Sequence, residues 1–294
     1  MQAVELTQGD MRLSLRPDLG GCIAGLWLGE VPVLRSTPPA QLHNVRLSAG
    51  YPLAPFSNRI GHAHLQWNGT GHPLVQNATG EEHAIHGVVW QRPWAVLDAS
   101  GSHALLCCEH RADTAWPFAF DCSQAFHLRS DGLDMTLSIT NQSHQAAPVG
   151  LGWHPYFVKR AQSRILFDAT GRWDMGPDKL PTQRQSSPGL NTDCAVLDSD
   201  HCFDGWAGTV ALHDEQLRIR ITSDLTRLVV FTHPSKDFVA IEPVSHVNNA
   251  MNMMANNGVN TVKTGQNCPD LGVRTLQPGE SWSVQMAIHV ERVR

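Results

Sequence analysis

The sequence lacks several features that would place it in other classes of protein. There is no basic stripe, and 22 lysines and arginines against 27 aspartates and glutamates give a net charge of −5. A nucleic-acid partner is therefore not expected. No window holds the ~18 apolar residues of a membrane helix, and the first ten residues lack a basic start followed by an apolar run. These absences predict a cytoplasmic protein without a membrane or nucleic-acid partner.

Cysteine spacing of the metal-binding or redox type is also missing. The seven cysteines form an odd set without a CxxC motif, which argues against a disulfide framework and for free, buried thiols. Helical periodicity is equally scarce, because no stretch of ~12 residues carries an amphipathic helical pattern. A helical bundle and a disulfide-rich secreted fold are both disfavoured.

The pattern that dominates the chain is an alternation of apolar and polar residues with a period of two. It runs through four segments, residues 11–15, 133–140, 217–221 and 284–290. Such alternation is typical of antiparallel strands that bury one face, and turn pairs such as Asn68-Gly69 separate the runs. Because no Ser/Gly linker interrupts the pattern, we predict an all-β protein with one domain over residues 1–294.

Two stretches break the alternation. Residues 171–193 are rich in proline, glutamine and serine, and residues 245–268 are rich in asparagine and methionine. Both are predicted as long loops, and long ordered loops in a compact domain often shape a binding site.

Four short segments concentrate titratable groups beside aromatic and turn residues. In chain order they are Pro55–Ile60 (PFSNRI), His83–Gly87 (HAIHG), Gly152–Phe157 (GWHPYF) and Ile241–Ser245 (IEPVS). In this order they resemble the NRI, HG, HPYF and EP elements of the aldose 1-epimerase (galactose mutarotase) family, with HPYF the most specific. The resemblance covers nearly the whole chain and is closest to a bacterial mutarotase-like branch.

The resemblance implies an antiparallel β-sandwich of the galactose mutarotase type. It also implies an isomerase that needs no cofactor and no metal, and that interconverts the α and β anomers of a free aldose. In this reaction the cyclic hemiacetal loses the proton of its anomeric hydroxyl while its ring oxygen gains one. One base and one acid are therefore expected on opposite sides of the acetal carbon.

The resemblance assigns the catalytic roles to three residues. Glu242 is the base, and its apolar neighbours predict a pKa raised by burial. His154 is the acid, with an imidazole expected to titrate near neutral pH. His86 would stabilise the transition state through a hydrogen bond to the ring oxygen or a nearby hydroxyl, and Gly87 would let the backbone approach the ligand closely.

The same resemblance implies a set of residues that bind the sugar. Arg59 would donate hydrogen bonds to adjacent hydroxyls, and Asn58 would hold the loop or touch the sugar. Asp200 resembles the aspartate of the family's D-x-x-F element, although a neighbour such as Asp204 lies close enough in sequence to take this role. Since sugars stack on indole faces, Trp153 is expected to line the pocket.

Three other interpretations stay open. A metal-dependent β-barrel enzyme would use His62 and His64, placed on one face of a strand. A non-catalytic carbohydrate-binding sandwich would need Arg59 and the tryptophans but neither Glu242 nor His154. An epimerase for a phosphorylated or sulfonated hexose would keep the acid and base and add an arginine cluster, of which the motifs show one member. A monomer and a homodimer fit the sequence equally well.

Overall fold

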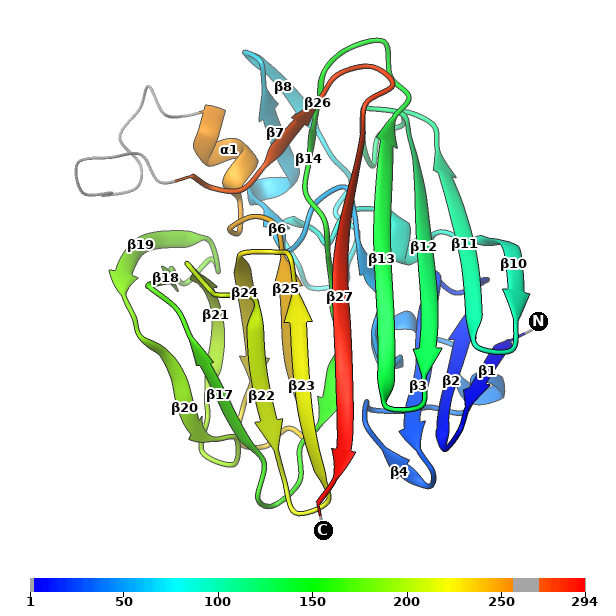
Figure 1. The fold of residues 1–294 in the computed structure, drawn as a ribbon. Coiled ribbons are helices and arrows are strands. Elements are labelled where there is room, and N and C mark those ends of the chain that lie inside the picture. The colour runs from blue at the N-terminus through cyan, green and yellow to red at the C-terminus, as the bar shows by residue number, and fades with distance from the viewer. Residues whose placement is uncertain (1–2, 256–269, 294) are drawn as a thin grey trace.

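The computed structural model describes residues 3–255 and 270–293, and strands make up most of it (Figure 1). One layer is a nine-stranded antiparallel sheet in the order β10-β11-β12-β13-β27-β23-β22-β17-β20. Its strands are β10 (Ala95–Ser100), β11 (His103–His110), β12 (Phe120–Arg129), β13 (Gly132–Asn141), β17 (Arg164–Asp168), β20 (Gly189–Asp193), β22 (Thr209–His213), β23 (Leu217–Ser223) and β27 (Ser281–Arg292). Three of the predicted alternating segments thus become the adjacent strands β13, β27 and β23.

The second layer consists of two sheets. An eight-stranded sheet has the order β19-β18-β21-β24-β25-β15-β5, with β16 also pairing to β25, and a four-stranded sheet has the order β1-β2-β3-β4. Their strands are β1 (Val4–Gln8), β2 (Met11–Arg16), β3 (Cys22–Leu28), β4 (Val31–Pro32), β5 (Pro52–Leu53), β15 (Gly152–Trp153), β16 (Tyr156–Val158), β18 (Gly171–Met175), β19 (Pro181–Ser186), β21 (Ser199–Asp204), β24 (Arg227–Thr232) and β25 (Phe238–Val244). The bridge between Leu34 and Phe157 joins the two sheets.

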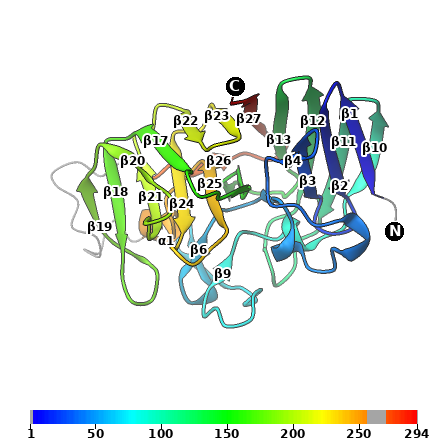
Figure 2. The same ribbon diagram turned by 90° about the horizontal axis from the view of Figure 1, so that it is seen from below.

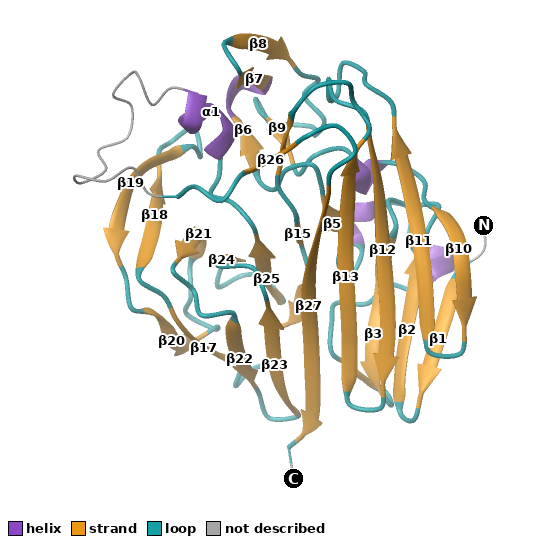
Figure 3. Ribbon diagram, turned by 45° about the horizontal axis from the view of Figure 1, so that its top comes forward, coloured by secondary structure: helices purple, strands orange, loops and turns teal. Residues whose placement is uncertain are grey.

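Short pairs and turns complete the fold (Figure 3). They are β6 (Arg59–Ile60) with β9 (Ala84–Ile85), β7 (His64–Trp67) with β8 (Thr70–Pro73), β14 (Ala147–Val149) with β26 (Arg274–Leu276), the helix α1 (Ala250–Ala255), and the 3-10 turns η1 (Pro39–Gln41), η2 (Val45–Leu47), η3 (Gly61–Ala63) and η4 (Val89–Gln91). The predicted Asn68-Gly69 turn links β7 to β8, and both residues have positive φ, as two-residue hairpins of this kind require.

The two layers pack face to face, and β1 and β2 lie against β12 (Figure 2). The main core fills the space between them, and a second apolar cluster covers the other face of the eight-stranded sheet. Strand β25 contributes to both: Val239 and Ile241 belong to the main core, whereas Ala240 and Val244 belong to the second cluster. Since side chains alternate along a strand, Glu242 lies on the face of the second cluster.

The prediction that residues 171–193 form a long loop is wrong, because they contain β18, β19 and β20. Strand β19 is the edge of the eight-stranded sheet and β20 is the edge of the nine-stranded sheet. Their side chains are exposed or half-buried throughout. An edge strand with polar residues on both faces shows no alternation of apolar and polar residues, so its sequence does not predict a strand.

The asparagine-rich stretch is described only as far as residue 255, and residues 256–268 lie outside the described residues. Its first part clamps the segment that follows the NRI motif. Asn252 accepts a hydrogen bond from the Gln66 amide at 2.8 Å and donates to the His64 carbonyl at 2.9 Å. Asn249 accepts from the Gly61 amide at 3.0 Å. The side-chain amides of these two asparagines thus form hydrogen bonds with backbone N–H and C=O groups that would otherwise need a neighbouring strand as partner.

Two smaller findings concern thiols and membranes. Six of the seven cysteines lie in the described residues and all six are free thiols. In the same residues no helix is long and apolar enough to cross a bilayer.

Candidate active site

Strand register brings His154 and Glu242 together. Strand β15 pairs Gly152 with Val244, and β16 pairs Tyr156 with Ala240. The two short strands therefore continue one register along β25, and His154, between them, lies opposite Glu242. Residues opposite each other in an antiparallel pair project to the same face, and His154 Nε2 lies 3.2 Å from Glu242 Oε1.

This contact corrects the expectation that acid and base face each other across the acetal carbon. They lie side by side, because they are cross-strand neighbours on one sheet face. The chemistry tolerates this arrangement, since the anomeric hydroxyl oxygen and the ring oxygen are bonded to the same carbon. A side-by-side carboxylate and imidazole can therefore each reach one of these two oxygens.

Burial controls the protonation of both groups. The exposed fractions are 2% for Glu242 and 6% for His154. Burial raises the pKa of Glu242 well above its usual value, and the nearby Asp200 charge raises it further. The raised pKa of Glu242 is as the sequence predicts. Burial also lowers the pKa of His154 to about 3, so the expectation that this imidazole titrates near neutral pH is wrong.

Two tyrosines enclose the His154 ring. Tyr51 stacks on it with ring centroids 4.9 Å apart, and Tyr156 lies at 4.4 Å and 33°. Their hydroxyls are 3.3 Å from each other. These are the only two tyrosines of the chain, and their rings cover His154 and hold its ring plane.

Asn58 determines which nitrogen of His86 carries the proton. The backbone N–H of Asn58 donates to His86 Nδ1 at 3.2 Å, and the backbone N–H of His86 donates to the backbone carbonyl of Asn58 at 2.8 Å. Burial lowers the pKa of His86 well below its usual value, so the ring is neutral at pH 7 and its proton sits on Nε2. Since the His86 and His154 rings meet edge to face at 5.2 Å, the site contains a fixed donor beside the acid–base pair.

Arg59 is held by a carboxylate that the sequence motifs do not reveal. Its Nε and Nη2 donate to the two Glu81 oxygens at 3.1 and 2.9 Å, and its Nη1 donates to Asn58 Oδ1 at 3.2 Å. These hydrogen bonds hold the guanidinium in one plane, and Arg59 as a whole is 7% exposed. Arg59 thus belongs to an ion pair and to the site at once.

Asp200 lies on the same sheet face as the acid–base pair. It pairs with Phe231, which pairs with Ala240, which in turn pairs with Tyr156. These four residues form one cross-strand row, and Glu242 lies two residues along β25 from this row. The sheet therefore forms a floor that carries both carboxylates.

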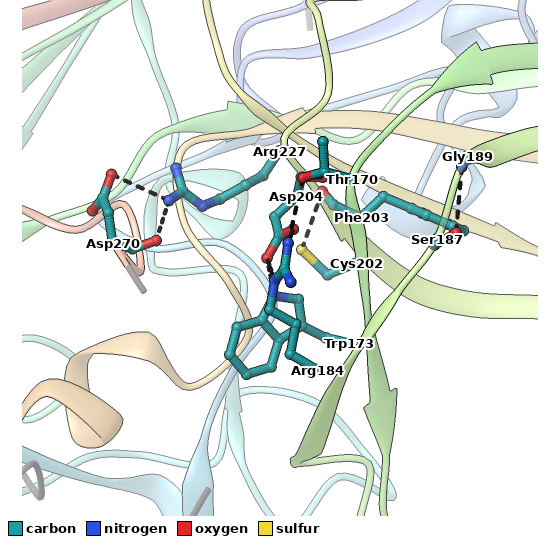
Figure 4. Close-up of polar contacts among 10 residues, drawn as sticks. All are labelled: Thr170, Trp173, Arg184, Ser187, Gly189, Cys202, Phe203, Asp204, Arg227 and Asp270. Carbon is teal, nitrogen blue, oxygen red and sulfur yellow. Dashed lines mark hydrogen bonds and ion pairs between the residues drawn. The ribbon is translucent and has the colours of Figure 1, made fainter. Parts of the chain in front are cut away.

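Asp204, the alternative to Asp200, has a different role (Figure 4). Its carboxylate accepts two hydrogen bonds from Arg184, both at 2.7 Å, and one from the Trp173 indole at 2.8 Å. These three contacts occupy the group within the sheet, so the structure places Asp200 and not Asp204 in the site.

These side chains surround a hollow of about 220 Å³. Its lining residues are Arg46, Tyr51, Asn58, Arg59, Glu81, Ile85, His86, His154, Tyr156, Lys179, Asp200, Phe231 and Glu242. A larger hollow of about 680 Å³ adjoins it across Glu81, but its lining includes neither Glu242 nor His154. Six of the predicted site residues therefore meet in one place, while Arg46, Tyr51, Glu81 and Lys179 were not predicted.

Trp153 is the predicted residue that the structure places elsewhere. It belongs to the main core and does not line the hollow. The reason is strand alternation: His154 points to the sheet face that carries the second apolar cluster, so Trp153, the residue before it, points to the main core. None of the nine tryptophans lines this hollow, and its aromatic surfaces are Tyr51, Tyr156 and Phe231.

Two further expectations need correction. Gly87 does not line the hollow; a Cβ there would meet the Ala54 carbonyl oxygen at 2.0 Å, so this glycine allows two chain segments to cross. His62 and His64 do not share a strand face, since His62 has φ of 53° in η3 and only His64 begins β7. In residues 3–255 and 270–293, no three His, Cys, Asp or Glu side chains are grouped to bind a metal ion.

Proteins of known structure support this fold. A putative aldose 1-epimerase from Escherichia coli K12 has a similar structure, with a TM-score of 0.85, 27% identity and coverage of 99% of both chains. A galactose mutarotase-like protein from Clostridium acetobutylicum has a TM-score of 0.82 at 18% identity, covering 98% of this chain and 95% of the other. The structure is therefore an antiparallel sandwich of the galactose mutarotase type.

The sequence comparisons give the family. The family model for aldose 1-epimerase matches residues 2–289. The uncharacterized protein YphB of Escherichia coli K12 is 29% identical, over 99% of each chain. The chain belongs to the aldose 1-epimerase family.

Proposed function

We propose that the protein is an active aldose 1-epimerase that interconverts the α and β anomers of a free aldose by opening and closing its ring. The observation that carries this proposal is the 3.2 Å contact between His154 and Glu242, buried at the base of a sugar-sized hollow. A carboxylate and an imidazole with shifted pKa values in one hollow are typical of acid–base catalysis.

In the proposed reaction Glu242 takes the proton of the anomeric hydroxyl while His154 protonates the ring oxygen. The C1–O5 bond breaks, the C1–C2 bond rotates, and the same proton transfers run backwards on the other face of C1. This cycle needs the charge on Glu242 and the proton on His154. Because burial disfavours charge on both, we propose that the pair shares one proton, and that moving this proton along their contact produces the reactive form.

The remaining groups orient the sugar. His86 Nε2–H donates to the ring oxygen or a neighbouring hydroxyl, with the tautomer set by Asn58. Arg59 offers donors held in one plane by Glu81, and Asp200 accepts from a hydroxyl. The rings of Tyr156 and Phe231 provide apolar surface for the C–H face of the pyranose.

Polarimetry tests this proposal. Fresh solutions of α-glucose, α-galactose, fucose and rhamnose are followed to their equilibrium rotation with and without protein. We expect the rate constant for at least one sugar to rise in proportion to protein concentration. A protein that binds these sugars without accelerating any of them is a carbohydrate-binding sandwich, and the proposal fails.

A further inference from the structure

The fold places a cation behind one of the two rings that cover His154. Arg35 directly follows the bridge between Leu34 and Phe157 that joins the two sheets of the second layer. Its backbone N–H donates to the Tyr156 carbonyl at 2.7 Å, and its guanidinium carbon lies 3.9 Å from the centre of the Tyr156 ring. Arg35 therefore contacts the tyrosine that contacts the candidate acid, although it belongs to none of the four sequence motifs.

The guanidinium and the imidazole occupy opposite faces of Tyr156. The centre of the His154 ring lies 4.4 Å from that of Tyr156, with 33° between the ring planes. Two planar groups this close to one ring centre would overlap if they shared a face, because non-bonded carbon atoms stay about 3.5–4.0 Å apart. One phenol ring thus separates Arg35 from His154, and Arg35 does not line the hollow.

The charge of Arg35 has no carboxylate partner in residues 3–255 and 270–293. Within these residues the guanidinium donates to backbone carbonyls, from Nε and Nη2 to Ser48 at 3.2 and 2.7 Å and from Nη2 to Arg46 at 2.6 Å. These oxygens hold the half-buried side chain over the ring without cancelling its charge. Since a cation is attracted to the face of an aromatic ring, the contact holds Tyr156 in its plane.

The same charge acts on His154. Burial lowers the pKa of His154 to about 3, and the charges of Arg35 and Arg46 act in the same direction. An imidazolium near a cation is a stronger acid, which favours the transfer of its proton to a weakly basic ring oxygen. A fixed ring plane and a high acidity are both properties that the acid of the proposed reaction requires.

We propose that Arg35 is a positioning residue for the candidate acid, because it holds the Tyr156 ring against His154 from the opposite face of that ring. This inference rests on the proposed function and adds a residue that lies outside the sugar hollow. A displaced acid transfers its proton slowly even when the substrate binds normally. The role therefore predicts that loss of Arg35 lowers kcat with little change in KM.

A double-mutant cycle on the kcat of mutarotation tests this role. Arg35→Gln should lower kcat at least about fivefold and leave KM within about twofold of the wild-type value. In the Tyr156→Leu background, which lacks the intervening ring, the same substitution should change kcat by less than about twofold. Arg12→Gln is the matched control and should keep the wild-type kcat. Arg12 also covers an aromatic ring, at 3.8 Å from the centre of Trp27, but neither residue lines the hollow.

The NMR resonances of the His154 ring give a readout that does not depend on catalysis. They are identified by their loss in His154→Asn. We expect them to move downfield in Arg35→Gln, because a less tightly held Tyr156 ring shields them less, and to stay in place in Arg12→Gln. A purely structural contribution of Arg35 to stability would not move them in protein that circular dichroism shows to be folded.

The outcomes separate this inference from the proposed function. The role of Arg35 is rejected if Arg35→Gln leaves kcat unchanged, lowers it equally in both backgrounds, or leaves the His154 resonances in place. If no sugar is turned over, or if Tyr156→Leu is inactive, the resonances alone decide whether Arg35 positions His154. If Arg35→Gln is unfolded, Arg35→Met, which keeps the length of the stem, replaces it, and a second unfolded variant rejects the proposal in favour of a purely structural role.

Discussion

At the residue scale, the proposed catalysis depends on two groups, Glu242 and His154, in which burial disfavours the charged form. The sequence predicts the raised pKa of Glu242 because its apolar neighbours on β25 are adjacent in the chain. It does not predict the lowered pKa of His154. Tyr51, which stacks on that ring, lies about a hundred residues away and outside every motif. The local sequence thus predicts that a side chain is buried when its neighbours in the strand are apolar. It does not predict that a side chain is buried by an aromatic ring from a distant part of the chain.

The pH dependence of the rate follows from the two lowered histidine pKa values. The reactive pair needs one exchangeable proton, and a second proton binds only as the pH approaches the pKa of about 3 of His154. His86 stays neutral over the same range because burial lowers its pKa. As the pH falls from roughly 6.5 to roughly 5, we therefore expect no loss of kcat/KM greater than about twofold.

The measurement is a polarimetric pH series, with a thermal melt at each pH to confirm that the protein is folded. An unburied histidine acid would give a different profile, because its pKa would lie near ~6.5. Loss of activity centred near that pH in folded protein would contradict the assignment of His154.

At the element scale, register explains why motifs far apart in sequence form one site. HPYF and EP meet because β15 and β16 continue one register along β25. Alternating strands such as β13 and β23 could be predicted because each buries one face. The polar edge strands β19 and β20 could not, since exposure on both faces removes the pattern.

The backbone at Gly87 predicts that the HG element does not tolerate a side chain at this position. Gly87 has φ of 71° and its Cβ position lies 2.0 Å from the Ala54 carbonyl oxygen. Gly87→Ala therefore combines left-handed strain with a backbone clash and should lower the free energy of unfolding by at least ~3 kcal/mol. It should also displace His86 and reduce activity.

Gly69→Ala is the matched control, since Gly69 has φ of 75° but no atom within 4 Å of its Cβ position. It should cost only ~1 kcal/mol of left-handed strain. Urea denaturation of both variants measures the difference in the free energy of unfolding. Equal destabilisation would show that the contact between Gly87 and the Ala54 carbonyl leaves room for a methyl group.

At the scale of the whole molecule, both layers bury the main core, but only the layer with the eight-stranded sheet contributes residues to the hollow. The sequence predicts a sandwich because alternating strands must bury one face against another sheet. It does not predict the wall of the hollow. Arg46, Glu81 and Lys179 come from three separate turns, and no local pattern connects them.

This division predicts that core damage in the nine-stranded sheet lowers stability without changing the chemistry. Leu137 on β13 is fully buried, whereas Leu97 on β10 is 61% exposed. Leu137→Ala should destabilise the protein by about 2–5 kcal/mol, and Leu97→Ala by no more than about 0.5 kcal/mol. Both should retain wild-type kcat and KM at 25 °C. Denaturation curves with mutarotation assays check this, and a large change in KM for Leu137→Ala would refute it.

The most direct test of the central claim is the mutarotation rate of Glu242→Gln, His154→Asn and the double variant on the best wild-type substrate. If the two groups act as one acid–base pair, each single variant loses at least about 100-fold in kcat. The kcat of the double variant is then little lower than that of the less active single variant. Circular dichroism verifies that all three are folded. A folded single variant within about threefold of the wild-type rate would contradict the account.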